Sequence, residues 1–260
     1  MLIYDETVDF RYNDGEHKYT VAKKVDETFG PHVPVTGTTT IISVIAKPAL
    51  MLWPMREAIT HLKGLDKKPT EKDFIDAASA HRQKADAGTK AGKIGHALVE
   101  ALLLGKKVKM PTDEKTREQA ESVQSAFEKW QADFEPTTID TEKPFYSLTH
   151  NFAGTYDYLC EIDGKLTMVD FKTTNTSRYN PDGIYAENFA QLGAYLIGAE
   201  EMDGVEIDAA MVVNLPKDGA DYKVKSLAEM RLTKTDAKLY FLNCLALYEL
   251  DKQFNWKVKG

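Results

Sequence analysis

The chain has 260 residues, of which 43% are hydrophobic and 28% are charged, a composition that is ordinary for a globular protein with a packed core. At roughly 100–200 residues per domain, this length suits one large domain or one domain with an appendage. No apolar run approaches the roughly 20 residues of a membrane span. The first residues lack the basic and apolar segments of a secretory signal, so we expect a cytoplasmic protein.

The net charge of −7 is opposite in sign to the basic balance that is typical of nucleic-acid-binding proteins. Positive charge is concentrated between residues 61 and 109, where eleven Lys and Arg residues stand against six Asp and Glu residues, an excess of five. Such a stretch fits a local track for DNA and equally fits a set of solvated helix faces. The two cysteines, Cys160 and Cys244, are far apart and suit buried thiols in a reducing compartment.

Residues 1–88 are predicted to form a small hairpin followed by helices. The hairpin has alternating residues around Asp14-Gly15, a two-residue turn signal. Helical patterns begin near residue 40, and Pro54 suits a helix start. The predicted helices end at three glycines: Gly64, Gly88 and Gly105.

Residues 89–260 are predicted to form the main body of the protein. A long amphipathic helix over residues 113–134 has one apolar stripe at spacings of three and four, which indicates a buried face: Val123, Phe127, Trp130 and Phe134. Strands are predicted at 137–148, 152–162, 165–173, 208–215 and 222–232, and helices at 185–200 and 233–250. The order αβββαββα indicates an α/β (α+β) fold, a mixed central sheet flanked by helices, beside a helical N-terminal region.

The hairpin over residues 154–173 carries the most informative pattern. Asp163-Gly164 is a type I′ turn signal, and with this turn Asp157 faces Asp170 while Thr155 faces Lys172. Facing residues of an antiparallel pair have Cβ atoms about 4.5–5.5 Å apart. The alternate residues form an apolar face that is expected to pack: Tyr156, Tyr158, Cys160, Val169 and Phe171.

Two facing carboxylates resist joint ionisation unless a cation neutralises them. Mg²⁺ or Mn²⁺, with their preference for oxygen ligands, would relieve the repulsion between Asp157 and Asp170. Lys172 points to the same side as Asp170 and could hold or activate the attacking water. The alternative is an exposed sheet face on which Lys172 merely balances charge.

This hairpin resembles the core of the PD-(D/E)XK nuclease superfamily, in which an aspartate on one strand and D/E-x-K on the next bind the metal. Three flanking segments resemble its RecB-type branch, in the expected order. GKIGHALVE resembles the helix that carries His96 and Glu100, EKPFYS resembles the strand that opens the core, with Glu142 in place, and AQLGAY resembles the helix that carries Gln191 and Tyr195.

The resemblance implies an αβββαβ core over residues 89–260, and roles for its residues. Asp157 and Asp170 would bind one or two Mg²⁺ or Mn²⁺ ions, with His96 and the carbonyl of Phe171 as further ligands. Glu100 would orient the ligands or support a second ion, and Gln191 and Tyr195 would position the substrate or Lys172. His96 and Glu100, four residues apart, share one helix face, as do Gln191 and Tyr195. A satisfied His96 and a plain polar helix edge at Gln191 are the alternatives.

The N-terminal half resembles stand-alone phage-type exonucleases of this branch, in which a helical region arches over the active site. The residues that would line a track for phosphates are His81, Arg82, Lys84, Lys90 and Lys93. Trp53 could stack on a base, or could simply belong to the core.

The sequence also departs from parts of the family. Tyr156 stands where the proline that names the superfamily is expected, a letter that often varies in this branch. Two cysteines cannot hold the iron–sulfur cluster of some relatives, which use four. The phosphate-binding loop of ATP-driven motors does not occur in this chain.

The sequence therefore predicts a metal-dependent DNA exonuclease that acts on single strands or strand ends. Two alternatives are a structure-specific endonuclease with the same site and a nucleic-acid-binding protein that keeps the fold without cleaving. DNA is the expected partner, and by analogy with the family a single-strand annealing or binding protein would be another.

Overall fold

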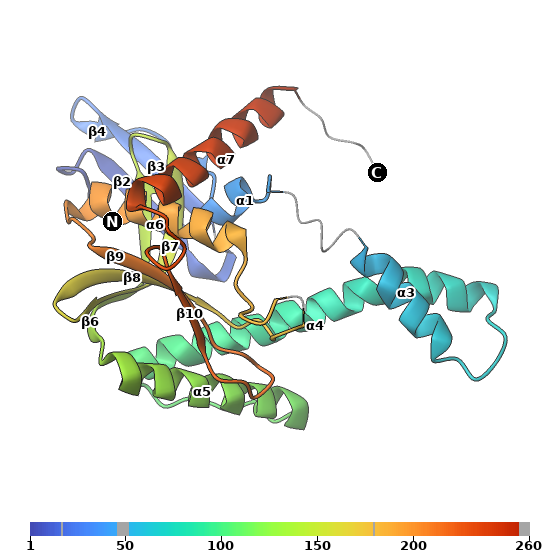
Figure 1. Ribbon diagram of the computed structural model, residues 1–260. Helices are drawn as coiled ribbons and strands as arrows, with labels where there is room; N and C mark the ends of the chain where they lie inside the picture. The colour runs from blue at the N-terminus through green and yellow to red at the C-terminus, as the bar shows by residue number, and fades with distance from the viewer. Residues whose placement is uncertain (17, 46–51, 179, 255–260) are drawn as a thin grey trace.

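The computed structural model describes residues 1–16, 18–45, 52–178 and 180–254, with the backbone alone at 14, 83, 84, 86, 87 and 89–91. The chain forms two β-sheets, with helices packed on the second sheet and a helical hairpin that projects from it (Figure 1). No helix in these ranges is both long and apolar enough to cross a membrane.

The first sheet is built from the N-terminal residues and is entirely antiparallel. Its order is β1-β2-β3-β4, with β5 paired to β3. The strands are β1 (Leu2–Ile3), β2 (Val8–Asn13), β3 (Lys18–Val25), β4 (Thr28–Phe29) and β5 (Val33–Val35).

The predicted hairpin is the β2–β3 pair, but its loop is longer than expected. Asn13 lies opposite Lys18, and a short 3₁₀ helix, η1 (Asp14–Glu16), follows β2. The two-residue turn at Asp14-Gly15 is therefore wrong. The sheet around the hairpin was not predicted, because strands of two or three residues are too short to show an alternating pattern.

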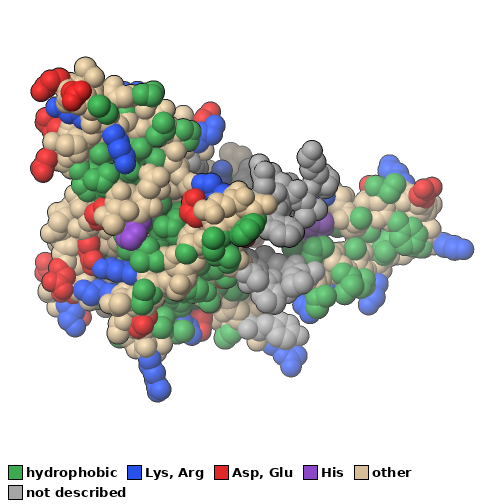
Figure 2. Space-filling model, turned by 90° about the horizontal axis from the view of Figure 1, so that it is seen from above, with side chains coloured by type: hydrophobic (Ala, Val, Ile, Leu, Met, Phe, Trp, Pro, Cys, Tyr) green, Lys and Arg blue, Asp and Glu red, His purple; other side chains and the backbone are tan. Residues whose placement is uncertain are grey.

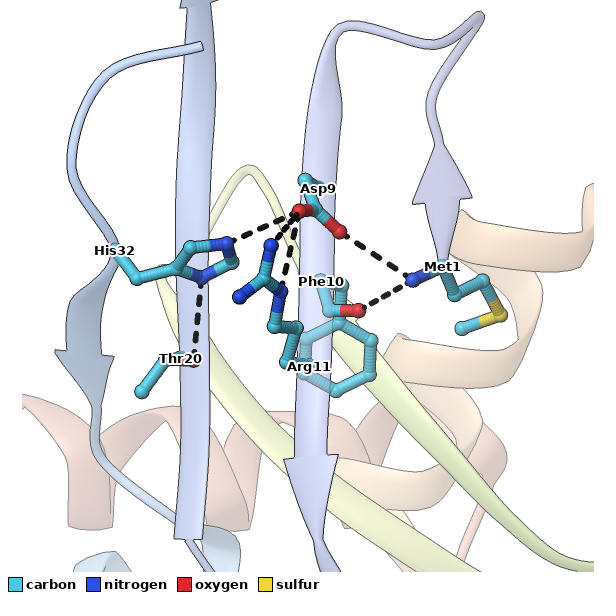
Figure 3. A network of polar contacts seen from close by, with 6 residues as sticks. All are labelled: Met1, Asp9, Phe10, Arg11, Thr20 and His32. Atoms are coloured by element: carbon cyan, nitrogen blue, oxygen red, sulfur yellow. Dashed lines mark hydrogen bonds and ion pairs between the residues drawn. The ribbon is translucent and has the colours of Figure 1, made fainter.

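The carboxylate of Asp9 holds this sheet together (Figure 3). Its Oδ2 accepts hydrogen bonds from Arg11 at 2.9 Å and contacts Nε2 of His32 at 3.0 Å, and its Oδ1 lies 3.3 Å from the amino group of Met1. Nδ1 of His32 lies 3.2 Å from Oγ1 of Thr20. These contacts join β1, β2 and β3 to the segment that leads into β5.

The helices that follow are α1 (Thr38–Ile42), α3 (Trp53–Lys63), α4 (Glu71–Leu103) and α5 (Glu114–Phe134). Pro54 lies in the first turn of α3, as predicted, and the predicted helix before it falls partly on residues 46–51, outside the described residues. The α3 helix packs against the first part of α4, and the two project away from the sheets (Figures 1 and 2).

The α4 helix is continuous, so the predicted helix end at Gly88 is wrong. A capping box between Thr70 and Asp73 starts it. A single glycine within a helix costs only about 1 kcal/mol relative to Ala, which a helix of 33 residues tolerates. The helix thus joins the projecting hairpin to the body of the protein and crosses the predicted domain boundary between residues 88 and 89. That domain division stays a prediction.

The second sheet has the order β10-β9-β8-β7-β6, with β8 and β9 parallel and the other pairs antiparallel. Its strands are β6 (Thr137–Ser147), β7 (Phe152–Ile162), β8 (Lys165–Lys172), β9 (Ala209–Asn214) and β10 (Lys223–Ser226). The remaining helices are α6 (Ala186–Asp203) and α7 (Lys234–Phe254). The predicted mixed sheet and the order αβββαββα are confirmed.

Both faces of this sheet are buried. One face packs on α4 and α5 through the predicted stripe, of which Val123, Phe127 and Trp130 are buried and Phe134 packs against them. The other face packs on α6 and α7. Tyr156 belongs to this second cluster and stacks on Phe145, so its predicted place on the same apolar face as Tyr158 is wrong.

The last strand is shorter than predicted, because β10 ends at Ser226. The carboxylate of Glu229 accepts hydrogen bonds from the backbone N–H of Ser226 at 2.8 Å and from its hydroxyl at 3.0 Å, which turns the chain. Thr233 caps α7, as one of two predicted candidates: its Oγ1 accepts from the N–H of Asp236 at 3.1 Å.

Candidate active site

Three side chains that could together hold a metal ion meet between α4 and the second sheet. His96 comes from α4, Glu142 from β6 and Asp157 from β7, and one donor atom of each lies within 4.8 Å of the others. One imidazole nitrogen with two carboxylate oxygens suits a divalent cation such as Mg²⁺ or Mn²⁺. Gly95 allows the close approach of α4, since a Cβ there would lie 2.7 Å from Thr173.

Glu142 was not among the predicted ligands, although the resemblance placed it in the opening strand. The register of β6 and β7 runs from Thr141 opposite Tyr158 to Lys143 opposite Tyr156, which brings Glu142 beside Asp157. Its φ of 48° lies in the left-handed region, which is uncommon for a residue other than glycine. Such strain persists only where the surroundings impose it, and it is frequent at functional sites. The signal that was overlooked is strand pairing across β6.

Asp170 and Lys172 form a buried ion pair beside these ligands. Lys172 Nζ donates to Oδ1 of Asp170 at 2.6 Å, and Asp170 is completely buried. Oδ2 of Asp170 has no hydrogen-bond partner among the described residues. A buried carboxylate oxygen without a partner is costly, and an additional positive charge would relieve that cost.

The predicted hairpin register is confirmed from the turn to the site. Ile162 lies opposite Lys165 and Tyr158 opposite Val169, and both turn residues have positive φ angles. Among the described residues, the ladder between β7 and β8 ends at this last pair.

The two predicted pairs beyond it, Asp157 with Asp170 and Thr155 with Lys172, are not paired residues of this ladder. The reason is local: Oδ2 of Asp157 accepts the N–H of Phe171 at 2.8 Å, in place of a backbone carbonyl. On its other edge β7 pairs with β6, where Thr155 lies opposite Pro144. The two aspartates still interact electrostatically, as the hairpin argument required.

The electrostatics of the cluster fit a missing positive charge. Burial raises the pKa of Asp170 to about 7, with Lys172 opposing and Asp157 adding to the shift. Burial also raises the pKa of Asp157, against the effects of Lys172 and of the Phe171 N–H. Burial acts to lower the pKa of Lys172, but Asp170 and Asp157 outweigh it and raise this pKa above its usual value. The ligand atoms of the cluster and the buried carboxylates with raised pKa values therefore suit a bound cation.

His96 is neutral at physiological pH. Burial, with a smaller effect of Lys172, lowers the pKa of its imidazole to about 4. Its Nδ1 lies 3.9 Å from Oδ2 of Asp157. A neutral imidazole has a lone pair to offer a cation, as predicted for this residue.

Gln191 and Tyr195 lie on one face of α6, as predicted, and a chain of contacts links Gln191 through Tyr195 to Asp157. The side-chain amide of Gln191 donates to the hydroxyl of Tyr195, and Tyr195 hydrogen-bonds Asp157. Burial, followed by the charges of Asp157 and Asp170, raises the pKa of Tyr195 well above its ordinary value. Tyr195 therefore stays protonated and acts as a hydrogen-bond donor to Asp157.

The site opens into a cavity of about 890 Å³. Lys93, His96 and Glu100 of α4 line it, together with Glu142 and Asp157. Residues of the N-terminal sheet and Tyr248 of α7 also line it. The structure thus brings Glu100 and Lys93 to the same cavity as the metal-ligating residues, and their roles stay predictions.

The other predicted DNA-contacting residues lie on the projecting hairpin. Arg82 is exposed, and the side chains of Lys84 and Lys90 lie outside the described part of the chain. Trp53 is half-buried, where its Nε1 donates to Glu57 at 3.0 Å and its ring meets the ring of His81 edge-on. These contacts fit either prediction for Trp53. The carbonyl of Phe171 as a ligand also stays a prediction.

Comparison with known families identifies the superfamily of the chain. A profile of the PD-(D/E)XK nuclease superfamily matches residues 64–249. The chain belongs to this superfamily. It is a nuclease by family, and the members of this superfamily use divalent metal ions.

Two solved structures are similar to this nuclease. One is an alkaline exonuclease (LHK-Exo) from Laribacter hongkongensis, at 12% identity, with a TM-score of 0.35 and coverage of 86% of this chain and 94% of that one. The other is LHK-Exo in complex with dAMP, at 14% identity, with a TM-score of 0.33 and coverage of 85% and 93%. No curated protein matches the chain.

Proposed function

We propose that the protein is a DNA exonuclease that depends on Mg²⁺ or Mn²⁺ and hydrolyses phosphodiester bonds at strand ends. Membership of the nuclease superfamily is the starting point. The observation that carries the proposal is the convergence of His96, Glu142 and Asp157 beside the buried Asp170–Lys172 pair, at the wall of one cavity.

Asp157, Glu142 and His96 would hold the cation, and Asp170, which has one oxygen without a partner among the described residues, interacts electrostatically with Asp157 and His96. A cation held there would stabilise the negative charge that develops on the phosphate. Lys172 orients the attacking water and keeps its proton, since the two aspartates raise its pKa. Asp170 in turn fixes the position of Lys172 through the 2.6 Å contact.

A second set of residues positions the ligands. Tyr195 donates a hydrogen bond to Asp157, and Gln191 fixes the hydroxyl of Tyr195. The N–H of Phe171 donates to the same carboxylate. Asp157 is therefore held by donors from α6 and β8, which sets the direction of its oxygens before any substrate binds.

Action on strand ends is supported by the walls of the cavity. The candidate ligands and residues of the N-terminal sheet line the same cavity. A sheet beside the ligands limits the room for an uninterrupted duplex, whereas the end of a single strand is narrower. The same site in an endonuclease would need to accept continuous DNA.

The test is cleavage of linear single-stranded DNA, labelled at one end or the other, beside a circular single strand of the same sequence. We expect loss of the linear substrate with Mg²⁺ or Mn²⁺, no loss with EDTA, and an intact circle. Cleavage of the circle at the rate of the linear strand would instead identify an endonuclease. Cleavage in EDTA would show that the reaction does not require a divalent cation.

The role of Lys172 is tested with a matched pair of variants in one strand. Lys172→Ala should reduce cleavage by at least about 10²-fold, the lower range for a group that takes part in proton transfer or orients a nucleophile, and should leave DNA binding intact. Lys165→Ala, at the exposed far end of β8, should cleave like the wild type. A Lys172→Ala variant that binds DNA and cleaves at the wild-type rate would remove Lys172 from the reaction.

A further inference from the structure

Aromatic rings form a row from the core of the N-terminal sheet to the cavity. Tyr146 stacks on Phe10 with ring centroids 6.1 Å apart, and Phe10 stacks on Tyr19 at 6.2 Å. Tyr19 stacks on Tyr12, its partner across β2 and β3, at 4.9 Å with an angle of 15° between the rings. Phe10 and Tyr146 are buried, whereas Tyr12 and Tyr19 are half-buried and line the cavity.

The two tyrosines are held in place from several sides. The hydroxyl of Tyr19 lies 3.0 Å from Oγ1 of Thr155, which is two residues before Asp157 on β7. Gly37 lies so close to the ring of Tyr19 that a Cβ there would approach it to 3.3 Å. The contacts of Asp9 join the strands that carry both rings (Figure 3). Tyr12 and Tyr19 are therefore a fixed wall, in contact with the strand that carries a metal ligand.

A positively charged side chain lines the same cavity as these rings. Lys18 precedes Tyr19 and also lines the cavity, and its side chain is mostly exposed. Its carboxylate partner is Glu16, at 2.9 Å, and both members of the pair face solvent. Exposed pairs of this kind contribute little free energy, so Lys18 can exchange Glu16 for a phosphate at small cost.

Aromatic rings and an ammonium group that line one cavity complement an unpaired nucleotide. The base can stack on a ring, and the phosphate can contact the ammonium group. We propose that Tyr12, Tyr19 and Lys18 form a subsite for the base and phosphate of an unpaired nucleotide that flanks the scissile bond. This subsite rests on the proposed function, because it lines the same cavity as His96, Glu142 and Asp157. It implies that the strand end is single-stranded where it enters the site.

The experiment measures the affinity of the full-length Lys172→Ala variant for a short fluorescent single strand, in the presence of Mg²⁺, by anisotropy. One abasic position is moved along the strand, starting from the end. We expect one or two positions near the end at which loss of the base weakens binding roughly 5- to 150-fold, the range reported for stacking on one aromatic side chain.

Tyr12→Leu, introduced into the Lys172→Ala variant, should weaken binding of the intact strand by a similar factor. It should have little further effect on the strand that is abasic at the sensitive position, because the two changes remove one interaction. Tyr12→Phe retains a ring and should bind like the parent. Phe29→Leu is the matched control, as it removes a ring from β4 of the same sheet, outside the cavity lining.

Equal losses by Tyr12→Leu for the intact and the abasic strand would overturn the subsite, since the ring would then act on the fold or on the whole strand. Affinity within about twofold of the parent for Tyr12→Leu would also overturn it. If wild-type protein cleaves linear DNA while the abasic scan is flat, the subsite fails and the proposed function stands. If wild-type protein neither binds nor cleaves, both fail.

Discussion

Replacing Asp170 by Asn isolates the electrostatic cost of the metal-free site. The folded protein keeps a proton on Asp170 up to a pKa of about 7, whereas the unfolded chain releases it near the ordinary value of 3.8. Between these two values the folded state holds one proton more than the unfolded state. The free energy of unfolding of the wild type must therefore fall as the pH rises, by this contribution.

The magnitude follows from the shift. About three pH units, at about 1.4 kcal/mol per unit, amount to about 4 kcal/mol between pH 4 and 7 for a fully buried carboxyl group. The variant lacks this contribution. The substitution also removes the carboxylate partner of Lys172. This changes the free energy of unfolding by an amount that does not depend on pH, because Lys172 stays protonated throughout the range. His96, whose depressed pKa makes stability rise with pH from about 4 to 6.5, is present in both proteins, so its contribution differs between them only through the effect of Asp170 on its pKa, which is smaller than that of burial.

The assay is urea denaturation in EDTA at pH 4.5, 5.5, 6.5 and 7.5, followed by tryptophan fluorescence. We expect the free energy of unfolding of Asp170→Asn minus that of the wild type to increase by about 1.4 kcal/mol for each unit by which the pH rises toward 7, and to level off above pH 7. Asp163→Asn, at the exposed turn of the same hairpin, is the matched control. A difference that stays constant within about 0.5 kcal/mol, or that the control shares, would refute the reasoning.

Three further predictions concern the ligands, their positioning and the packing. Mn²⁺ at about 100 times its dissociation constant should stabilise the wild type by about 2.7 kcal/mol in thermal or urea unfolding, and Glu142→Gln should need a higher Mn²⁺ concentration for the same gain; equal titrations would exclude Glu142 as a ligand. Tyr195→Phe should reduce cleavage by about 10- to 100-fold while folding and DNA binding persist, because Asp157 loses a donor; an unchanged rate would contradict that positioning role. Gly193→Ala should lower the free energy of unfolding by about 1–3 kcal/mol, since its Cβ would overlap the backbone of Ala237, and unchanged urea unfolding would contradict this α6–α7 contact.

Local interactions explain which parts of the fold and the site were predictable. The turn at Asp163-Gly164 and the alternation of the flanking strands set the register of the hairpin, so the relation between β7 and β8 follows from about twenty consecutive residues. The strands and helices after residue 110 were found because each is long enough to show its own period. Family motifs added His96, Gln191 and Tyr195, which the structure brings to the hairpin.

Other features depend on contacts between segments that are distant in the chain. A single Gly88 does not decide whether a helix stops, because the decision rests on the energy of the whole of α4. The short strands β1, β4 and β5 form because β2 and β3 offer them a partner. Their residues alone carry no signal for a strand.

The sequence by itself determined the nuclease hairpin, its Asp157, Asp170 and Lys172, and the order of the elements around them, because those features depend on neighbouring residues and on repeated periods. Only the tertiary structure decided that Glu142 joins His96 and Asp157, since the register of β6 on β7 shifts between Thr138 and Asp140 and α4 packs against β6. It also placed the N-terminal sheet, and with it Tyr12 and Tyr19, at the same cavity as the candidate metal ligands.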